Sequence, residues 1–174
     1  MNPTSGPAAS EPPWPLACYE ETFDGVRLRW QGFANLQETL NAFIAAAADR
    51  EFADPASEQA ALARIPYYGG LWPSARALAA MLAVRRDQLP GTAVLELGCG
   101  LALPAMLAAR WGARVLATDF HPAVAELLHG NIARNELADS LRYQQVDWRT
   151  CPDLGARYPW IIGSDILYEA AQVP

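Results

Sequence analysis

A glycine-rich turn is the first feature of the sequence that could do chemistry. Residues 94–100 read VLELGCG, in which a short apolar run leads into two glycines. Glycine has no Cβ, so such a turn lets the backbone approach a ligand closely, and a following helix offers unpaired N–H groups to it. A two-glycine turn also occurs as a plain connection between a strand and a helix, so its meaning depends on other residues.

Acidic residues end the two apolar runs that follow. Asp119 lies twenty-one positions after Gly98, a spacing at which a carboxylate can accept the hydroxyl hydrogens of a ribose. Asp147 ends the third run and could accept the exocyclic amine of an adenine, while Trp148 beside it offers an apolar wall. Glu96 lies at the end of the first run. Because the carboxyl ends of parallel strands meet at one edge of a sheet, these residues predict a nucleoside-binding crevice.

The residues after the turn favour one class of nucleoside. A dinucleotide-binding motif needs a third glycine, but Leu103 occupies that position and Pro104 follows it. Proline lacks the N–H that a pyrophosphate would use at the start of a helix. S-adenosylmethionine (AdoMet) carries no phosphate and tolerates this loss. The pattern therefore favours AdoMet over a dinucleotide.

Four runs in the second half of the chain carry a family resemblance. They are YYGGLWPSARALAAML at 67–82, VLELGCGLALPAMLAARWGARVLATDFHPAVAELLHGNIARNEL at 94–137, VDWR at 146–149 and IIGSDILYE at 161–169. In this order they resemble the class I, or seven-β-strand, AdoMet-dependent methyltransferases, in the lysine methyltransferase-like group related to nicotinamide N-methyltransferase. The resemblance extends over residues 67–174.

The resemblance implies a set of cofactor-binding residues, which are Trp72, Glu96, Gly98, Gly100, Asp119, Asp147 and Trp148. The glutamate and the two glycines would contact the methionine and ribose of AdoMet, and the first tryptophan would close the pocket. The family has a further glycine where this chain has Ala102, which is small but cannot adopt a positive φ cheaply.

The segment from Asp165 to Tyr168 is the candidate catalytic element. Methyl transfer from a sulfonium requires a neutral, positioned nucleophile and exclusion of water. An amine with a solution pKa of about 10.4 must first lose a proton. Asp165 could then accept the remaining hydrogens of the amine, and Tyr168 could contact it by a hydrogen bond or its ring face. Alternatively, Asp165 caps a helix and Tyr168 packs in the core.

Short apolar runs alternate with helical patterns in the second half. Strands are predicted at 93–97, 114–118, 141–146 and 160–164, and helices at 101–111 and 122–137. A helix is predicted to begin after an N-cap at Ser74 and to run to Leu89. This alternation predicts an α/β fold with a Rossmann-like parallel sheet.

The first half reads differently. Asp24-Gly25 within 19–30 predicts a β-hairpin, and Asn35 is expected to cap a helix at 36–49. A weaker helical pattern covers 53–64. We expect a disordered tail at 1–15, an accessory region at 16–66 and an AdoMet-binding Rossmann-like domain at 67–174. The family's sheet has three more strands after the fourth, so we also expect that the chain is truncated or that a partner completes its sheet.

Composition narrows the class of protein. The net charge of −6 disfavours nucleic acid as a partner, and no apolar stretch approaches the length of a membrane span. Three scattered cysteines suggest neither disulfides nor a zinc site, and His121 with His129 makes a poor metal pair. The thirteen basic residues are all arginine, which fits a GC-rich bacterial origin. We expect a cytoplasmic protein without a metal.

The functional prediction is an AdoMet-dependent N-methyltransferase that acts on a protein lysine or another amine. A small-molecule amine is the alternative substrate within this class. A different class also fits the residues, namely a non-catalytic module that binds AdoMet or a nucleoside, or an incomplete fragment of a methyltransferase.

Overall fold

The computed structural model describes residues 14–49, 52, 54, 57, 64–150 and 152–167 of the chain. Most of the predicted tail at 1–15 and of the weaker helix at 53–64 lies outside these residues, and so does Tyr168.

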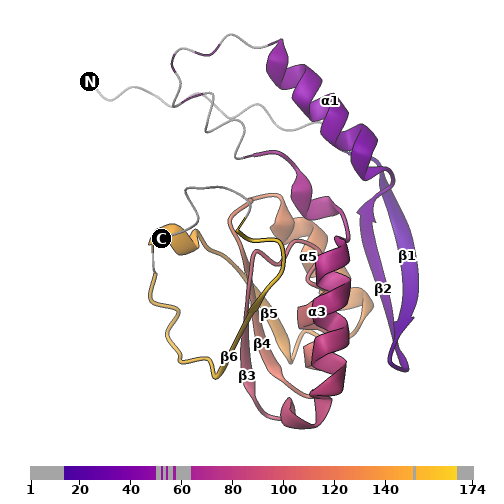
Figure 1. Ribbon diagram of the computed structural model, residues 1–174, viewed down its shortest axis with the longest axis vertical. Coiled ribbons are helices and arrows are strands. Elements are labelled where there is room, and N and C mark those ends of the chain that lie inside the picture. Colours follow the sequence, from indigo (N-terminus) through magenta and orange to yellow (C-terminus); the bar gives the residue numbers. More distant parts are fainter. Residues whose placement is uncertain are drawn as a thin grey trace.

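A four-stranded parallel sheet forms the centre of the structure (Figure 1). Its strands are β3 (Ala93–Leu97), β4 (Arg114–Asp119), β5 (Leu141–Gln145) and β6 (Trp160–Gly163), in the order β5-β4-β3-β6. All three pairings are parallel. The strands coincide with the predicted apolar runs to within one residue at either end, and the predicted α/β class with a Rossmann-like sheet is confirmed.

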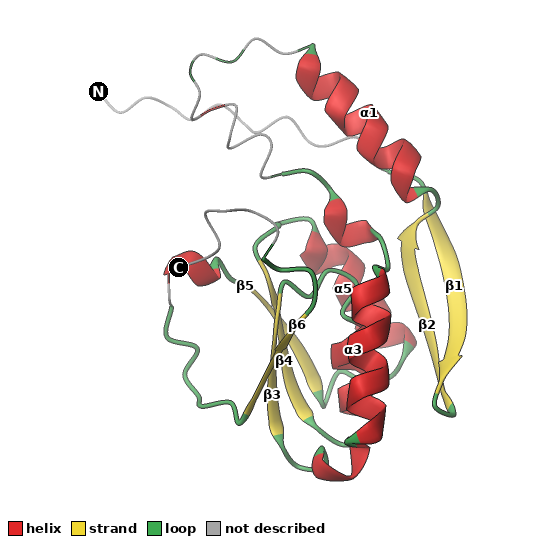
Figure 2. Cartoon of the chain, in the orientation of Figure 1, coloured by secondary structure: helices red, strands yellow, loops and turns green. Residues whose placement is uncertain are grey.

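Three helices pack on or beside this sheet (Figure 2). They are α3 (Pro73–Val84), α4 (Leu103–Arg110) and α5 (Val124–Arg134). Helix α4 contacts β3, β4 and β5, and α3 packs against α4. None of the helices in the described part of the chain is long and apolar enough to cross a membrane.

The predicted start of α3 is wrong by two residues. The helix begins at Pro73, and Trp72, not Ser74, is its N-cap residue. Proline suits the first helical position because its φ is already fixed near the helical value and its missing N–H would have no partner there. Ser74 therefore lies inside the first turn. The helix also ends at Val84, and a separate 3₁₀ turn covers Arg86–Gln88.

The N-terminal hairpin and helix are confirmed. Strands β1 (Leu16–Phe23) and β2 (Val26–Phe33) pair antiparallel around Asp24 and Gly25. These turn residues have φ of 46° and 79°, as a two-residue hairpin loop requires. Helix α1 (Leu36–Ala48) follows, and the side chain of Asn35 accepts a hydrogen bond from the Glu38 N–H at 3.1 Å.

Two asparagine side chains, Asn131 of α5 and Asn135 at its C-cap, hold the hairpin. The amide of Asn131 bonds both the N–H and the C=O of Gln31, at 2.7 and 3.0 Å. The amide of Asn135 makes the same pair of bonds with Arg29, at 3.0 and 2.6 Å. Both asparagines are buried. The helices thus lie between the sheet and the hairpin (Figure 1).

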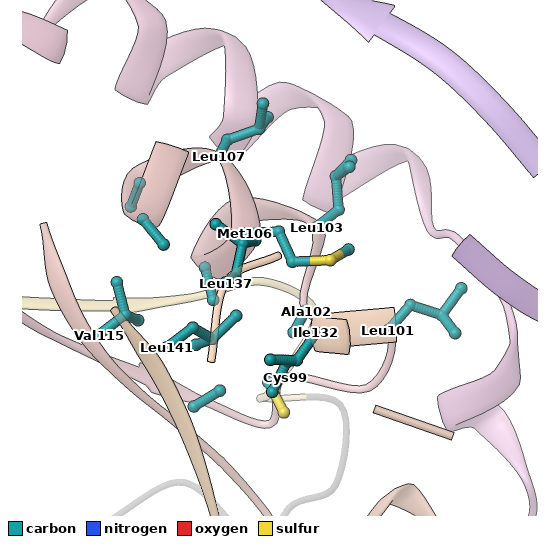
Figure 3. Packing of buried hydrophobic residues seen from close by; sticks show 14 of the residues in the cluster. Cys99, Leu101, Ala102, Leu103, Met106, Leu107, Val115, Ile132, Leu137 and Leu141 are labelled. Atoms are coloured by element: carbon teal, nitrogen blue, oxygen red, sulfur yellow. The ribbon is translucent and has the colours of Figure 1, made fainter. Parts of the chain in front are cut away.

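The hydrophobic core lies between the helices and the sheet. Met106 and Leu107 of α4 are fully buried, and Leu141 of β5 and Ile132 of α5 pack in the same cluster (Figure 3). Cys99 and Leu101 of the glycine turn belong to this cluster as well. The turn is therefore fixed by the core on one side while its other side is available to a ligand.

Candidate functional site

A cavity of about 440 Å³ opens at the carboxyl ends of the parallel strands. Its wall is made by residues within 65–75, 98–103, 118–121, 146–149 and 164–166. This volume lies in the range of small-molecule and cofactor sites, and open α/β sheets bind ligands at this edge.

Six of the predicted site residues meet at this cavity, namely Trp72, Gly98, Gly100, Asp119, Trp148 and Asp165. Glu96 and Asp147 lie close by but are not among the residues of the wall. Tyr168 lies outside the described residues.

The glycine turn requires glycine at two positions. Gly98 and Gly100 have φ of 59° and 48°, in the left-handed region that favours glycine. A Cβ on Gly98 would lie 2.6 Å from Cγ2 of Ile166, and one on Gly100 would lie 3.2 Å from the backbone oxygen of Tyr68. The turn therefore needs glycine both for its conformation and for the close approach of two other segments.

Ala102 adopts the left-handed conformation, which is unfavourable for alanine. Its φ is 55°, it precedes α4, and its N–H donates to the Cys99 oxygen at 2.6 Å. A left-handed alanine costs on the order of 1 kcal/mol. The surrounding core supports it, because Ala102 is only 1% exposed.

Asp119 is held by backbone groups. Its Oδ2 accepts the N–H of Gly100 and its Oδ1 accepts the N–H of His121, both at 2.9 Å. Burial raises the pKa of this carboxyl, and the two hydrogen bonds oppose that effect. A carboxylate has about four acceptor positions, so both oxygens can accept further hydrogens from a ligand.

Glu96 lies behind the cavity wall. It is 1% exposed, and its Oε2 accepts the N–H of Ala105, in the first turn of α4, at 3.1 Å. Burial raises the pKa of Glu96 to about 8, and the nearby charge of Asp119 adds to the effect. Burial therefore favours the protonated form of Glu96, and its Oε2 holds the first turn of α4. Its predicted contact with the methionine portion of AdoMet stays a prediction.

Asp147 forms an ion pair with Arg149. The guanidinium of Arg149 donates to both carboxylate oxygens, at 2.8 and 2.9 Å, and the same group lies 4.9 Å from the centre of the Phe120 ring. The hydrogen bond from the Arg149 side chain holds the pKa of Asp147 below its ordinary value. Trp148 and Arg149 line the cavity, so Asp147 would reach an adenine only from beside them.

Aromatic residues close another side of the cavity. The indole N–H of Trp72 donates to the Tyr67 oxygen at 3.0 Å, and the rings of Tyr68 and His121 lie 4.4 Å apart. Nδ1 of His121 accepts the Ala123 N–H, so its Nε2 carries the hydrogen that is donated to the Arg64 oxygen.

Sequence reasoning missed Tyr68 as a site residue and considered His121 only as a metal ligand. No cluster able to hold a metal occurs among the described residues. His121 lies two residues after Asp119, just past the end of β4, and this position alone could have indicated that it lines the cavity.

Asp165 lies in the loop after β6 and lines the cavity. Its φ is 53°, and its Oδ2 accepts a hydrogen bond from the hydroxyl of Ser74. Ile166 beside it fills the space above Gly98 and Gly163. The alternative that Asp165 caps a following helix concerns residues outside the described part of the chain.

Known proteins resemble this chain over its second half. The human histone-arginine methyltransferase METTL23 is 36% identical over 107 residues, which cover 57% of this chain and 54% of that protein. The protein N-lysine methyltransferase METTL21A of Danio rerio is 33% identical over 103 residues, which cover 56% and 47%. The chain thus spans about half the length of these curated relatives.

A solved structure has the same fold. The 16S rRNA N2 G1207 methyltransferase RsmC of T. Thermophilus, in complex with AdoMet and guanosine, has a TM-score of 0.53 and 18% identity. It covers 87% of this chain, which in turn covers 33% of it. At family level, residues 67–174 match the lysine methyltransferase model. The prediction of a class I AdoMet-dependent methyltransferase is therefore confirmed for family and fold, and the chain belongs to the lysine methyltransferase family.

Proposed function

We propose that this chain binds AdoMet in the cavity and transfers its methyl group to a nitrogen atom of a protein substrate. The observation that carries the proposal is the cavity at the ends of β3 and β4, which joins Gly98, Gly100 and Asp119. Membership of the lysine methyltransferase family supports it.

The residues of the cavity fit the cofactor. Asp119 would accept the ribose hydroxyls, because both of its oxygens keep an acceptor position beside their backbone bonds. Trp148 and Phe120 would contact the adenine, and Trp72 would close the pocket. Asp147 could accept the exocyclic amine if Arg149 shares or releases its carboxylate.

For methyl transfer, the protein mainly has to position the acceptor nitrogen next to the methyl group of AdoMet. Bound AdoMet supplies an electrophilic methyl group on a sulfonium. Asp165 would accept hydrogens from the acceptor nitrogen and so orient its lone pair, and Tyr168 would contact the same nitrogen. The aromatic wall around Trp72 would exclude water.

Calorimetric titration with AdoMet and S-adenosylhomocysteine tests the cofactor assignment. We expect micromolar binding by the wild type and its loss in Asp119→Ala. Binding that is equally tight in the variant would exclude the ribose assignment.

The acceptor nitrogen is a protein lysine or another amine in this proposal. The names of the relatives include both arginine and lysine as acceptors, so two peptides that differ only in Lys or Arg at one position give the direct comparison. The chain contains no lysine, so any methyl-lysine found by mass spectrometry must come from the substrate. Methylation of the arginine peptide alone would overturn the amine acceptor. A free amine methylated in place of both peptides would favour a small-molecule substrate.

Asp165→Ala separates an enzyme from a binding module. The variant should keep its affinity for S-adenosylhomocysteine and lose methyl transfer. Retained turnover would exclude a catalytic role for Asp165.

The proposal also includes the predicted division of the chain into domains. Residues 67–174 would form the cofactor-binding domain and 16–66 an accessory region, a division that the limits of the family match support. A cytoplasmic location and a bacterial origin remain predictions from composition.

A further inference from the structure

Asp165 is held in place by its backbone and by its neighbour. Its φ of 53° is uncommon for a residue other than glycine, although aspartate tolerates it better than most residues. Ile166 is inserted where Gly98 and Gly163 lack side chains, since a Cβ on these glycines would lie 2.6 and 2.7 Å from its atoms. The loop after β6 is thereby fixed against the glycine turn that forms the base of the cavity.

The side chain of Asp165 is fixed by a second element. The hydroxyl of Ser74, in the first turn of α3, donates its hydrogen to Oδ2 of Asp165. The two residues are 91 positions apart in the chain. Trp72 and Ala75, on either side of Ser74, both line the cavity. The start of α3 therefore contacts the cavity and the Asp165 carboxylate at the same time.

This contact determines how the carboxylate can act. A hydroxyl has one hydrogen to donate, and here Oδ2 receives it, which restricts rotation of the carboxylate and leaves Oδ1 wholly available to accept from another group. Because Asp165 lines the cavity, that group would be the nitrogen that receives the methyl group.

We propose that Ser74 is a positioning residue for methyl transfer, which acts by orienting the Asp165 carboxylate toward the acceptor nitrogen. This inference rests on the proposed function. It assigns Ser74 no contact with the cofactor or the substrate.

Binding of two ligands tests the inference without turnover. Sinefungin is an AdoMet analogue with an amine-bearing carbon in place of the methylated sulfur, whereas S-adenosylhomocysteine has no group at that place. By calorimetry, the full chain should bind sinefungin more tightly, because the amine reaches Asp165. Ser74→Ala should weaken sinefungin binding by about tenfold, the value of one charge-assisted hydrogen bond, and leave S-adenosylhomocysteine binding within about twofold.

Further variants separate positioning from a structural role. Ser74→Thr keeps the hydroxyl and should restore sinefungin affinity. In an Asp165→Asn background, Ser74→Ala should cause no further loss, since the two residues act as one unit. Ser140→Ala is the matched control, because its hydroxyl donates to the Leu137 oxygen away from the cavity. In turnover, Ser74→Ala should lower kcat by about tenfold with the KM for AdoMet unchanged.

Three results would overturn the inference. They are equal affinity of the wild type for the two ligands, an equal loss of both ligands in Ser74→Ala, and a loss that persists in the Asp165→Asn background. If the wild type binds neither ligand, the proposed function fails, and the inference fails with it.

Discussion

The inner wall and the rim of the cavity hold their carboxyl groups in different ways. On the inner side, called the inner wall below, Asp119 lines the cavity and Glu96 lies directly behind it. Both are buried or nearly so and accept hydrogen bonds from backbone N–H groups. At the rim, Asp147 and Asp165 are more exposed and accept hydrogen bonds from the side chains of Arg149 and Ser74, and one backbone N–H, that of Arg149, also donates to Asp147.

This difference separates two tasks. Backbone donors on strand ends and helix starts move only if the fold moves, so the inner wall can fix where a cofactor lies. Side-chain donors can be exchanged by a single substitution that leaves the fold intact, so the rim is where affinity and specificity can change. The pKa directions agree, since burial raises the pKa of the inner groups and Arg149 lowers that of Asp147.

Asp119→Ala should have the largest effect. It removes the proposed ribose acceptor and leaves the N–H groups of Gly100 and His121 without this partner, so we expect a loss of about 3 kcal/mol in binding of S-adenosylhomocysteine. Calorimetry measures it, and urea unfolding reports whether the variant folds. Asp139→Ala, in an exposed turn, is the control. An unchanged affinity would remove the inner wall from cofactor binding.

Gly98→Ala should cost about 2 kcal/mol of stability, from a positive φ and from displacement of Ile166. Gly91→Ala is the matched control, because Gly91 also has a positive φ, of 71°, but nothing lies within 4 Å of its Cβ position. It should cost only about 1 kcal/mol. Urea unfolding of both variants gives the difference. Equal costs would mean that Ile166 does not tie the rim to the inner wall.

Glu96→Gln should change how stability depends on pH. The pKa of Glu96 is about 8 in the folded chain, against an ordinary value of 4.5, so the folded state keeps a proton that the unfolded state loses. The contribution is fully present below pH 4.5 and is lost as the pH rises through about 8. The slope is at most about 1.4 kcal/mol per pH unit.

In the glutamine variant this part of the slope should disappear. A smaller slope of the same sign should remain, because burial raises the pKa of Asp119 as well. Urea unfolding between about pH 5 and about pH 8 measures both slopes. Equal slopes in the wild type and the variant would show that Glu96 ionises freely in the folded chain.

Arg149→Ala should have the smallest effect. Its pair with Asp147 is partly exposed, and such pairs contribute less than about 1 kcal/mol to the free energy of unfolding. The variant also frees the Asp147 carboxylate from the guanidinium, although the backbone N–H of residue 149 still donates to Oδ1, so affinity for S-adenosylhomocysteine should stay the same or rise by up to about threefold. Calorimetry measures it. A tenfold loss would place Arg149 among the inner-wall residues in importance.

The inner wall could be predicted from sequence because its residues lie at strand ends. The apolar runs set the strands, the strands set the edge at which their carboxyl ends meet, and Gly98 and Asp119 follow at that edge. The hairpin turn at Asp24-Gly25 could also be predicted, since these two residue types favour the positive φ that a two-residue hairpin loop needs.

The rim depends on contacts between segments far apart in the chain. No spacing rule links Ser74 to Asp165, and a serine after a proline favours an N-cap, whereas Pro73 is itself the first residue of α3. The pairing of Arg149 with Asp147 is local, but whether an arginine covers its neighbour or points to solvent depends on the Phe120 ring. Such contacts become visible only when side chains are placed.

The asparagine pair on α5 matches the repeat of a helix to that of a strand. Four residues of a helix advance about 6 Å, and two residues of a strand advance about 6.8 Å, so Asn131 and Asn135 reach Gln31 and Arg29 together. One inserted residue between the asparagines would turn the second amide about 100° away. Evolution can therefore lengthen the hairpin at its Asp24-Gly25 tip, whereas changes along β2 or α5 must preserve this spacing, which makes the tip the place to attach a new segment.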